Sequence, residues 1–359
     1  MEARPGIELI QPYQGGKPIE EVERELGITD IIKLASNENP LGPAPMAVSA
    51  IKAAAEKVNL YPDGNSYYLK NDLAKHLNVK LENLILGNGS NEVLTIIGDT
   101  FVSPGDEVIY SEQAFVVYFL VANVCGAKSI TTPLLDYTHD LQAMADCITD
   151  KTKVIFIANP NNPTGTMVNA QQVEAFMRRV PDDVLVAFDE AYYEYVERDD
   201  YPQTLKYVHD GRNVIVLRTF SKIYGLAGLR IGYGISNENV IELMNKVRQP
   251  FNASLIAQAA AQASLKDTEH VEKSRRNNSE GKQYLYAKLA ELGIDYVPSE
   301  GNFILIHLNR SGQEVTDELL KFGVIVRPTT GYKFPNSIRV TVGTPEQNKR
   351  FIEALREVL

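Results

Sequence analysis

Short runs of apolar residues recur along this chain, and each of them stops at a cluster of polar residues or glycines. Four of these runs span residues 84–86, 153–158, 184–188 and 214–217. Amphipathic segments of helical length separate them, which is typical of buried parallel strands in an α/β sheet. Ligands of such sheets bind beyond the carboxyl ends of the strands. The four polar clusters are therefore predicted to meet at a single site.

The run 214–217 leads into Thr219, Ser221, Lys222 and Arg230, with glycines between them. Hydroxyl and guanidinium groups of this kind bind phosphates through charge-assisted hydrogen bonds. A lysine that is held in place and partly desolvated is a nucleophile near neutral pH, as the covalent attachment of pyridoxal phosphate requires. A solvated surface lysine is the alternative, and this segment alone does not decide between the two.

Residues 84–86 are followed by a turn with two glycines and then by a helical pattern. The free backbone N–H groups of Ser90, Asn91 and Glu92 would form a phosphate cup at the N-terminus of that helix. An ordinary strand-to-helix turn accounts for the same residues. Glu92 stands where the dinucleotide motif G-x-G-x-x-G has its last glycine, and the chain has no P-loop motif. Both facts argue against a nicotinamide or ATP site.

Asp189 ends an apolar run, where an unpaired carboxylate would be costly to bury. The ring nitrogen of pyridoxal phosphate is a cation with which it could pair, and this pairing lets the ring act as an electron sink. A helix N-cap or a surface salt bridge is the simpler alternative. Asn162, in a turn fixed by prolines and a glycine, and Tyr192 are candidate donors to the phenolic oxygen of the ring.

Three spaced motifs carry a resemblance to a known superfamily. They are NPNNPTG at 159–165, DEAY at 189–192, and Ser221-Lys222 with Arg230 eight residues after the lysine. In this order they resemble the aspartate-aminotransferase superfamily of fold-type I pyridoxal-phosphate enzymes, over nearly the whole chain. Within that superfamily the chain is similar to the histidinol-phosphate aminotransferase family at LASNENPLG (34–42), YPDG (61–64), 326–328 and 338–343. Aromatic aminotransferases and a cobalamin-pathway decarboxylase look similar at these narrower motifs.

The resemblance implies a role for each candidate residue. Lys222 would bond to the cofactor and shuttle a proton, and Asp189 would pair with the ring nitrogen. Phe115 stands where the family often has a tyrosine stacked on the ring. The other implied cofactor contacts are Asn162, Tyr192, Thr219, Ser221, Arg230, Ser90, Asn91, Glu92 and, from a second subunit, Tyr61. The implied substrate contacts are Arg339 at the carboxylate, Arg327 near the substrate phosphate, and Asn37.

The expected fold is α/β, with a large domain built on a mostly parallel central sheet and a smaller α+β domain. A chain of 359 residues is long for a single core. We expect an N-terminal arm (1–29) that joins the small domain, a large cofactor domain (30–255) and a small domain (256–359). Strands are predicted near 303–307, 324–326 and 338–342, and a final helix with Thr344, Pro345 and Gln347 in its first turn. Because Tyr61 is expected to reach across, a homodimer is the predicted active unit.

Composition sets further bounds. The net charge is −10, with 46 acidic and 36 basic residues, which argues against nucleic-acid or anionic-membrane partners. Two cysteines, Cys125 and Cys147, fit reduced thiols in a cytoplasmic protein. The five scattered histidines give no ligand spacing, so no metal is expected. Residues 1–15 lack a signal-peptide apolar region, and no apolar run is long enough to span a membrane.

The resemblance implies the function of a pyridoxal-phosphate-dependent aminotransferase in histidine biosynthesis. It would interconvert histidinol phosphate and 2-oxoglutarate with imidazole acetol phosphate and glutamate. An aromatic-amino-acid aminotransferase, or a decarboxylase of an amino-acid phosphate, would share the cofactor residues and differ only in the pocket. A non-catalytic binding module of the same fold is disfavoured because Lys222, Asp189, Arg230 and Arg339 are all present.

Overall fold

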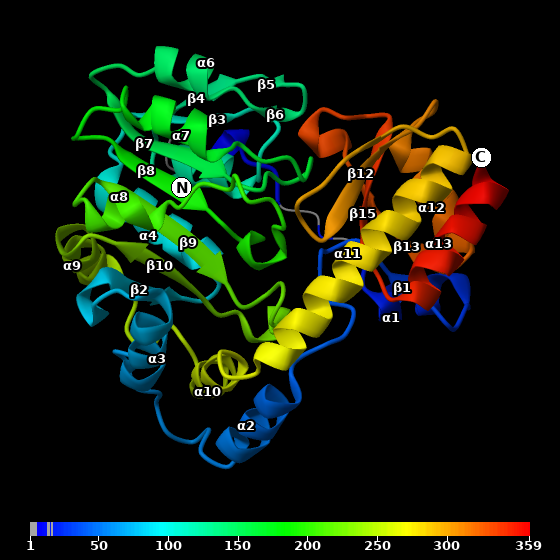
Figure 1. Cartoon of the computed structure of the whole chain (residues 1–359), viewed down its shortest axis with the longest axis horizontal. Helices are drawn as coiled ribbons and strands as arrows, with labels where there is room; N and C mark the ends of the chain where they lie inside the picture. The colour runs from blue at the N-terminus through cyan, green and yellow to red at the C-terminus, as the bar shows by residue number, and fades with distance from the viewer. Residues whose placement is uncertain (1–5, 13–14, 16) are drawn as a thin grey trace.

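A seven-stranded sheet forms the larger part of the molecule (Figure 1). The structure, a computed structural model, describes residues 6–12, 15 and 17–359, so residues 1–5, 13, 14 and 16 of the expected N-terminal arm lie outside the described residues. In spatial order the strands are β2(Leu84–Gly87), β10(Gly232–Ser236), β9(Val214–Thr219), β8(Leu185–Asp189), β7(Thr152–Ala158), β3(Glu107–Ser111) and β4(Lys128–Thr132). The four predicted apolar runs are thus confirmed as strands β2, β7, β8 and β9.

One strand of this sheet runs against the others. β10 is antiparallel to both of its neighbours, β2 and β9, whereas β4, β3, β7, β8 and β9 pair in parallel. The prediction that residues 84–86 form a strand with a parallel neighbour is therefore wrong, because the only strand paired with β2 in the described sheet is the antiparallel β10. β2 nevertheless points in the same direction as β9. As a result, the carboxyl ends of β2, β7, β8 and β9 lie at the same edge of the sheet. The mostly parallel sheet of the predicted fold class is confirmed.

Helices cover both faces of the sheet because its buried strands are apolar on both sides. Alternation along β7 shows this, since Ile155 and Ile157 join one core cluster while Val154 and Phe156 join the other. The first face packs against α2(Pro45–Ala55), α3(Tyr67–Leu77), α6(Leu141–Asp146), α7(Ala170–Met177), α8(Leu205–His209) and α10(Leu255–Ser264). The opposite face packs against α4(Ser90–Phe101), α5(Val117–Val124) and α9(Glu238–Val247).

A smaller antiparallel sheet lies beside the first, and the long helix α11(Thr268–Glu291) extends from α10 towards it (Figure 1). Its strands are β11(Tyr296–Val297), β12(Phe303–His307), β15(Ser337–Thr341) and β14(Arg327–Pro328), in that order. Side chains of α11, α12(Gly312–Lys321) and α13(Pro345–Val358) share a core with these strands. Helices α10 and α11 are separate because Asp267 caps the start of α11, where its side chain accepts a hydrogen bond from the backbone N–H of His270.

The N-terminal segment joins this smaller part of the molecule. β1(Ile32–Lys33) pairs in parallel with β13(Val324–Ile325), and Val22 of α1(Ile19–Leu26) packs against Ala35 and Ile325. The short remaining elements are β5(Leu134–Leu135), β6(Thr138–His139), η1(Ile7–Leu9), η2(Leu81–Asn83), η3(Tyr193–Tyr195), η4(Ala227–Leu229) and η5(Thr330–Tyr332). The domain limits at residues 29 and 255 stay predictions.

The last helix begins as its sequence predicts. The Thr344 side chain accepts a hydrogen bond from the Gln347 backbone N–H at 3.3 Å, and the Gln347 side chain accepts one from the Thr344 N–H at 3.0 Å. Pro345 occupies the first turn. This capping box is confirmed, and it directs Phe351 and Leu355 into the core of the smaller sheet.

Candidate active site

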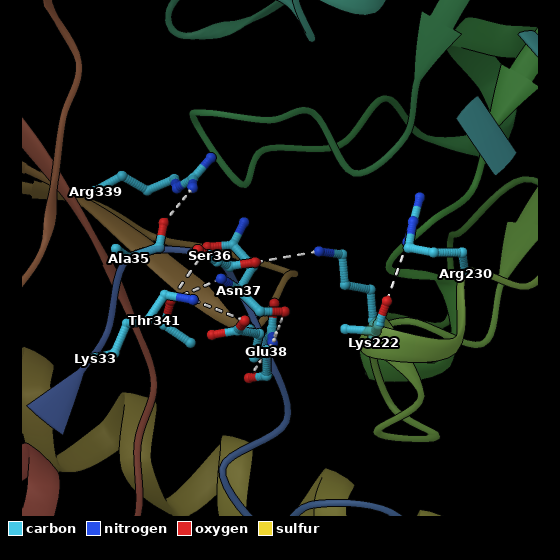
Figure 2. A network of polar contacts seen from close by, with 11 residues as sticks. Lys33, Ala35, Ser36, Asn37, Glu38, Lys222, Arg230, Arg339 and Thr341 are labelled. Carbon is cyan, nitrogen blue, oxygen red and sulfur yellow. Dashed lines mark hydrogen bonds and ion pairs between the residues drawn. The ribbon is translucent and has the colours of Figure 1, made fainter. Parts of the chain in front are cut away.

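One cavity lies at the edge where the carboxyl ends of β2, β7, β8 and β9 meet. Thirteen of the predicted site residues line it: Lys222, Asp189, Asn162, Tyr192, Thr219, Ser221, Arg230, Ser90, Asn91, Phe115, Arg339, Arg327 and Asn37. Figure 2 shows part of this lining, with Lys222 and Arg230 on one side and Arg339 with residues 35–38 on the other. The predicted meeting of four strand ends at one site is thus observed.

Lys222 stands on the loop that follows β9, where it is partly buried. Its Nζ donates a hydrogen bond to the carbonyl oxygen of Ser36 at 3.3 Å (Figure 2) and lies 5.6 Å from the centre of the Tyr192 ring. Burial and, to a smaller extent, the nearby Arg339 guanidinium lower the pKa of Lys222 to about 8. The reading as a solvated surface lysine does not fit this position, and the lowered pKa suits a nucleophilic amine.

Asp189 is the last residue of β8, and its side chain is buried. Tyr118 donates its hydroxyl to Oδ2 at 2.8 Å, whereas Oδ1 is buried and has no hydrogen-bond partner. Burial raises the pKa of Asp189 to about 6, against the lowering effect of the Tyr118 hydrogen bond. Because this carboxylate is neither a surface group nor a helix cap, its unsatisfied oxygen is a place where a cationic ligand atom would fit.

The N-terminus of α4 forms a cup with the loop that carries Arg230. Arg230 Nη1 donates to Ser221 Oγ at 3.2 Å, and Ser90 and Asn91 begin α4 opposite it. Gly89, with φ +75°, leaves room for the arginine, because a Cβ there would lie 2.4 Å from Arg230 Nη2. A helix N-terminus, hydroxyls and a guanidinium together bind phosphate well.

Glu92 and Tyr61 lie outside the cavity lining. The Glu92 carboxylate accepts hydrogen bonds from Asn88 N and from Asn252 Nδ2, both at 2.6 Å. Tyr61 is 81% exposed and stacks on Phe251, with the ring centres 4.8 Å apart. Its predicted contact comes from a second subunit, so it stays a prediction.

Tyr192 and Phe115 line the same cavity as the phosphate cup and the arginines. Tyr192 is buried, and burial raises its pKa to about 12, so the phenol keeps its proton. Its oxygen accepts a hydrogen bond from Asn37 Nδ2 at 2.9 Å, which leaves the phenolic proton to be donated. Phe115 lines the cavity and meets Tyr118 edge to face, with the ring centres 6.0 Å apart.

Two arginines stand at the other end of the cavity. Arg327 of β14 and Arg339 of β15 are directly opposite each other in the register of the smaller sheet. Arg339 is buried, and its Nη2 donates to the Ala35 carbonyl at 2.8 Å (Figure 2). Its Nη1 donates to Asn162 Oδ1 at 2.5 Å, while its Nε is buried without a partner. Asn37 is held beside them by a hydrogen bond from its backbone N–H to Thr341 Oγ1 at 2.9 Å.

Among the lining residues that were not predicted as site residues, Tyr118, Ser36 and Tyr332 are the most informative. Tyr118, the partner of Asp189, lies three residues after the predicted ring-stacking Phe115, so helical spacing was a usable signal. Ser36 contacts Lys222 through its backbone carbonyl, which no residue type reveals. Tyr332 enters the lining from η5, within a turn whose path depends on the smaller sheet.

Three further observations concern the described part of the chain. Cys125 and Cys147 form no disulfide bond. Within residues 6–12, 15 and 17–359, no group of three or more His, Cys, Asp and Glu side chains is arranged to hold a metal ion. None of the helices described there is long and apolar enough to cross a membrane.

Comparison with known proteins agrees with this geometry. Residues 29–355 match the family described as aminotransferase class I and II. The histidinol-phosphate aminotransferase of Moorella thermoacetica is 53% identical over 359 residues, covering 100% of this chain and 93% of that protein. That of Akkermansia muciniphila is 49% identical over 356 residues, covering 98% and 97%.

Solved structures show the same likeness. The histidinol-phosphate aminotransferase from Sinorhizobium meliloti, in complex with pyridoxal-5'-phosphate, has a TM-score of 0.91 and 30% identity, covering 99% of this chain and 97% of that one. A mutant aspartate aminotransferase from Thermus thermophilus, with a TM-score of 0.87, 23% identity and 100% of both chains covered, shares the fold. The fold is that of a fold-type I aminotransferase, and the chain belongs to the aminotransferase class I and II family. Within that family it groups with the histidinol-phosphate aminotransferases.

Proposed function

We propose that this protein is a pyridoxal-phosphate-dependent aminotransferase that interconverts histidinol phosphate and 2-oxoglutarate with imidazole acetol phosphate and glutamate, in histidine biosynthesis. One observation carries the proposal. The cavity has Lys222 and the half-satisfied Asp189 at one end and the arginine pair Arg327 and Arg339 at the other. The names of the relatives that share this chain's full length support the choice of substrate.

The residues of the cavity fit pyridoxal phosphate. The phosphate would be held by Thr219, Ser221, Arg230 and the N-terminus of α4, where Gly89 keeps the arginine close. The ring nitrogen would face Oδ1 of Asp189, which is buried and otherwise unpartnered. When bound, the cofactor supplies an electron-withdrawing ring that makes a proton on the substrate carbon removable.

Each side chain then has a defined task. The Lys222 amine would hold the cofactor covalently, and the same Nζ would serve as the proton carrier at the substrate carbon. Asp189 would keep the ring nitrogen protonated, since its own ionised form is stabilised by the hydrogen bond from Tyr118. Tyr192 would donate its phenolic proton to the ring oxygen, because Asn37 already occupies one of its acceptor sites.

The arginine pair accounts for two anionic substrates. Like charges directly opposite each other on neighbouring strands repel, so an anion between Arg327 and Arg339 is stabilised by both. The carboxylate of glutamate or 2-oxoglutarate would bind to Arg339, whose Nε lacks a partner. The phosphate of histidinol phosphate would bind near Arg327, which lines the same cavity.

We also propose a homodimer. Leu60 and Tyr61 are 61% and 81% exposed beside Phe251, which is 46% exposed, and apolar groups of this size rarely face water together. A two-fold partner that covers them would bring Tyr61 to the cofactor phosphate of the other subunit. Sedimentation of the wild type should give a dimer, and Tyr61→Phe should weaken cofactor affinity; a monomer with full activity would refute this.

We further propose a cytoplasmic location, which is the expectation from the cysteine usage.

A direct experiment tests the enzymatic proposal. Purified protein with pyridoxal phosphate should show a visible absorption band that borohydride abolishes, and it should transaminate histidinol phosphate with 2-oxoglutarate. Failure to form the band would favour a binding module. A band together with turnover of phenylalanine but not of histidinol phosphate would favour an aromatic aminotransferase.

A further inference from the structure

Two strands of the large sheet each end in a pair of consecutive polar residues with different surroundings. β8 ends in Asp189, which Glu190 follows, and β9 ends in Arg218 and Thr219. Asp189 is bonded to Tyr118 in the core on the α4 side, while Phe188 and Val216 belong to the opposite core. Because strand residues alternate between faces, Glu190 and Arg218 lie on the face away from Tyr118. Asp189 and Thr219, in contrast, line the cavity.

Glu190 and Arg218 form a buried ion pair on that opposite face. Nε and Nη2 of Arg218 donate to Glu190 Oε2 at 3.0 and 2.8 Å, and the exposed fractions of the two residues are 6% and 0%. Thr204 donates its hydroxyl to the other Glu190 oxygen at 2.5 Å. The Tyr193 ring lies against the guanidinium, with its centre 3.5 Å from the Arg218 Cζ. Every oxygen of the carboxylate is thus satisfied.

This pair stands where the strand ladder stops. The register of β8 and β9 ends at Asp189 opposite Leu217, and the Glu190 N–H donates to the Leu217 carbonyl at 2.8 Å. Directly after that bond, the side-chain hydrogen bonds between Arg218 and Glu190 connect the ends of β9 and β8. The neighbouring residues in the chain, Asp189 and Thr219, are those assigned to the ring nitrogen and the phosphate of the cofactor.

The pair also controls charge near Asp189. Glu190 is its neighbour in the chain, and the negative charge of Glu190 raises the pKa of Asp189, although less than burial does. Glu194 is a second buried carboxylate here. Burial raises its pKa to about 7, although the nearby Arg218 charge acts in the opposite direction. The other titratable or charged groups around the pair are His76, Tyr201, Tyr224, Tyr233 and Arg275.

A buried ion pair is weak evidence for a stabilising role, because desolvation of the two charges offsets their attraction. Such pairs are better explained where they fix one geometry among several. We infer that Arg218 and Glu190, assisted by Thr204, are positioning residues that hold the Asp189 and Thr219 ends of β8 and β9 at the spacing the cofactor requires. The inference rests on the proposed cofactor function. It adds to that function three residues, Arg218, Glu190 and Thr204, that do not line the cavity themselves.

The test uses Glu190→Gln and Arg218→Lys in the full-length protein, with Arg310→Met as the control. Arg310 also makes a two-pronged bond, to Glu318 at 3.0 and 2.8 Å, but this pair is partly exposed and lies in the smaller part of the molecule, away from the cavity lining. Three quantities are measured for each variant: the melting temperature without cofactor, the dissociation constant of pyridoxal phosphate alone, and kcat at saturating cofactor.

Both variants at the pair should weaken cofactor binding and lower kcat by about tenfold or more, as expected for loss of a charged hydrogen bond. Arg218→Lys should retain more cofactor affinity than Glu190→Gln, because it keeps the compensating charge while losing the fork geometry. The control should alter the melting temperature alone. Wild-type kcat and cofactor affinity in both variants, with only a lower melting temperature, would overturn the inference.

If Glu190→Gln does not fold, Thr204→Val decides, since it removes one hydroxyl donor and keeps both charges. A cofactor dissociation constant raised about threefold or more supports positioning, and an unchanged constant contradicts it. Failure of the proposed function would show separately. In that case wild type would bind pyridoxal phosphate without transaminating histidinol phosphate, and the cofactor dissociation constants of the variants would still report on the pair. A wild type that does not bind pyridoxal phosphate would overturn both the proposed function and the inference.

Discussion

The two ends of the cavity are built in different ways. At the cofactor end, Asp189, Thr219, Ser221, Lys222 and Ser90 all belong to strand ends, or to the segments directly after them, in a single sheet. At the substrate end, Arg339 and Arg327 come from the smaller sheet and Asn37 from the segment after β1. The first end is encoded by local sequence, whereas the second exists only once two sheets and the N-terminal segment have come together.

This difference predicts where substitutions act. Changes at the cofactor end should reduce the turnover of every substrate, because each amine uses the same ring and the same proton carrier. Changes at the substrate end should discriminate between substrates according to their anionic groups. The predictions that follow test this contrast in order of decreasing effect.

The largest loss should come from Lys222→Ala. Without its amine there is no covalent attachment and no proton carrier, so kcat should fall by about 10⁴-fold or more for histidinol phosphate and phenylalanine alike. The protein should still fold and bind pyridoxal phosphate non-covalently, which absorbance and circular dichroism would show. Lys282→Met is the matched control, because Lys282 is also buried but donates to the Ser299 carbonyl at 2.8 Å, outside the cavity lining. Turnover by Lys222→Ala close to wild type would move the attachment to another lysine.

Asp189→Asn should produce the next largest loss. An amide cannot hold the ring nitrogen in its protonated form, so kcat should fall by about 10²–10³-fold while cofactor affinity changes by less than about tenfold. Steady-state kinetics at saturating cofactor, together with a cofactor titration, separate the two effects. A loss explained entirely by cofactor dissociation would make Asp189 a structural contact.

Arg327→Ala should reveal the substrate end. Losing a charged hydrogen bond to a phosphate costs about 1.5–3 kcal/mol, which corresponds to about a 10- to 150-fold rise in the KM for histidinol phosphate. Phenylalanine carries no phosphate and serves as the internal control, with a change of less than about threefold. Equal losses for both substrates would mean that Arg327 acts through the general structure of the cavity and would remove the contrast between its two ends.

The smallest effect should come from Tyr118→Phe, which removes the hydrogen bond to Asp189. That bond lowers the pKa of Asp189 against the effect of burial, which raises it to about 6. Asp189 acts in its ionised form, so activity falls as the pH drops through this pKa. Without the hydroxyl the pKa rises further, and the acid limb of the kcat/KM profile should move to higher pH, with a loss of about tenfold or less near neutrality. An unchanged acid limb would mean that Tyr118 supports Asp189 only by packing.

The same contrast explains what the sequence could predict. The runs 84–86, 153–158, 184–188 and 214–217 are apolar enough to be strands in any buried sheet, and the polar residues after them then had to share one edge. The antiparallel neighbour of β2 could not be predicted, because β10 is a short strand with glycines at residues 232 and 234 and no apolar run of its own.

Contacts that depend on tertiary structure could not be predicted from the sequence. The carbonyl of Ser36 reaches Lys222 across 186 positions of the sequence, and Arg327 faces Arg339 only because the smaller sheet sets that register. The positions of these arginines in the family resemblance suggested their role but not their pairing. Tyr118 was within reach, since it lies one helical turn from a residue already singled out.

The central claim is that this cavity selects an amine carrying a phosphate, and one measurement tests it most directly. The kcat/KM values of the wild-type holoenzyme for histidinol phosphate and for phenylalanine are compared, with 2-oxoglutarate as the common acceptor. Two arginines at one end of the pocket predict a preference for histidinol phosphate of at least about tenfold, from one charged hydrogen bond. Equal values, or a preference for phenylalanine, would contradict the account and assign the pocket to an aromatic amino acid.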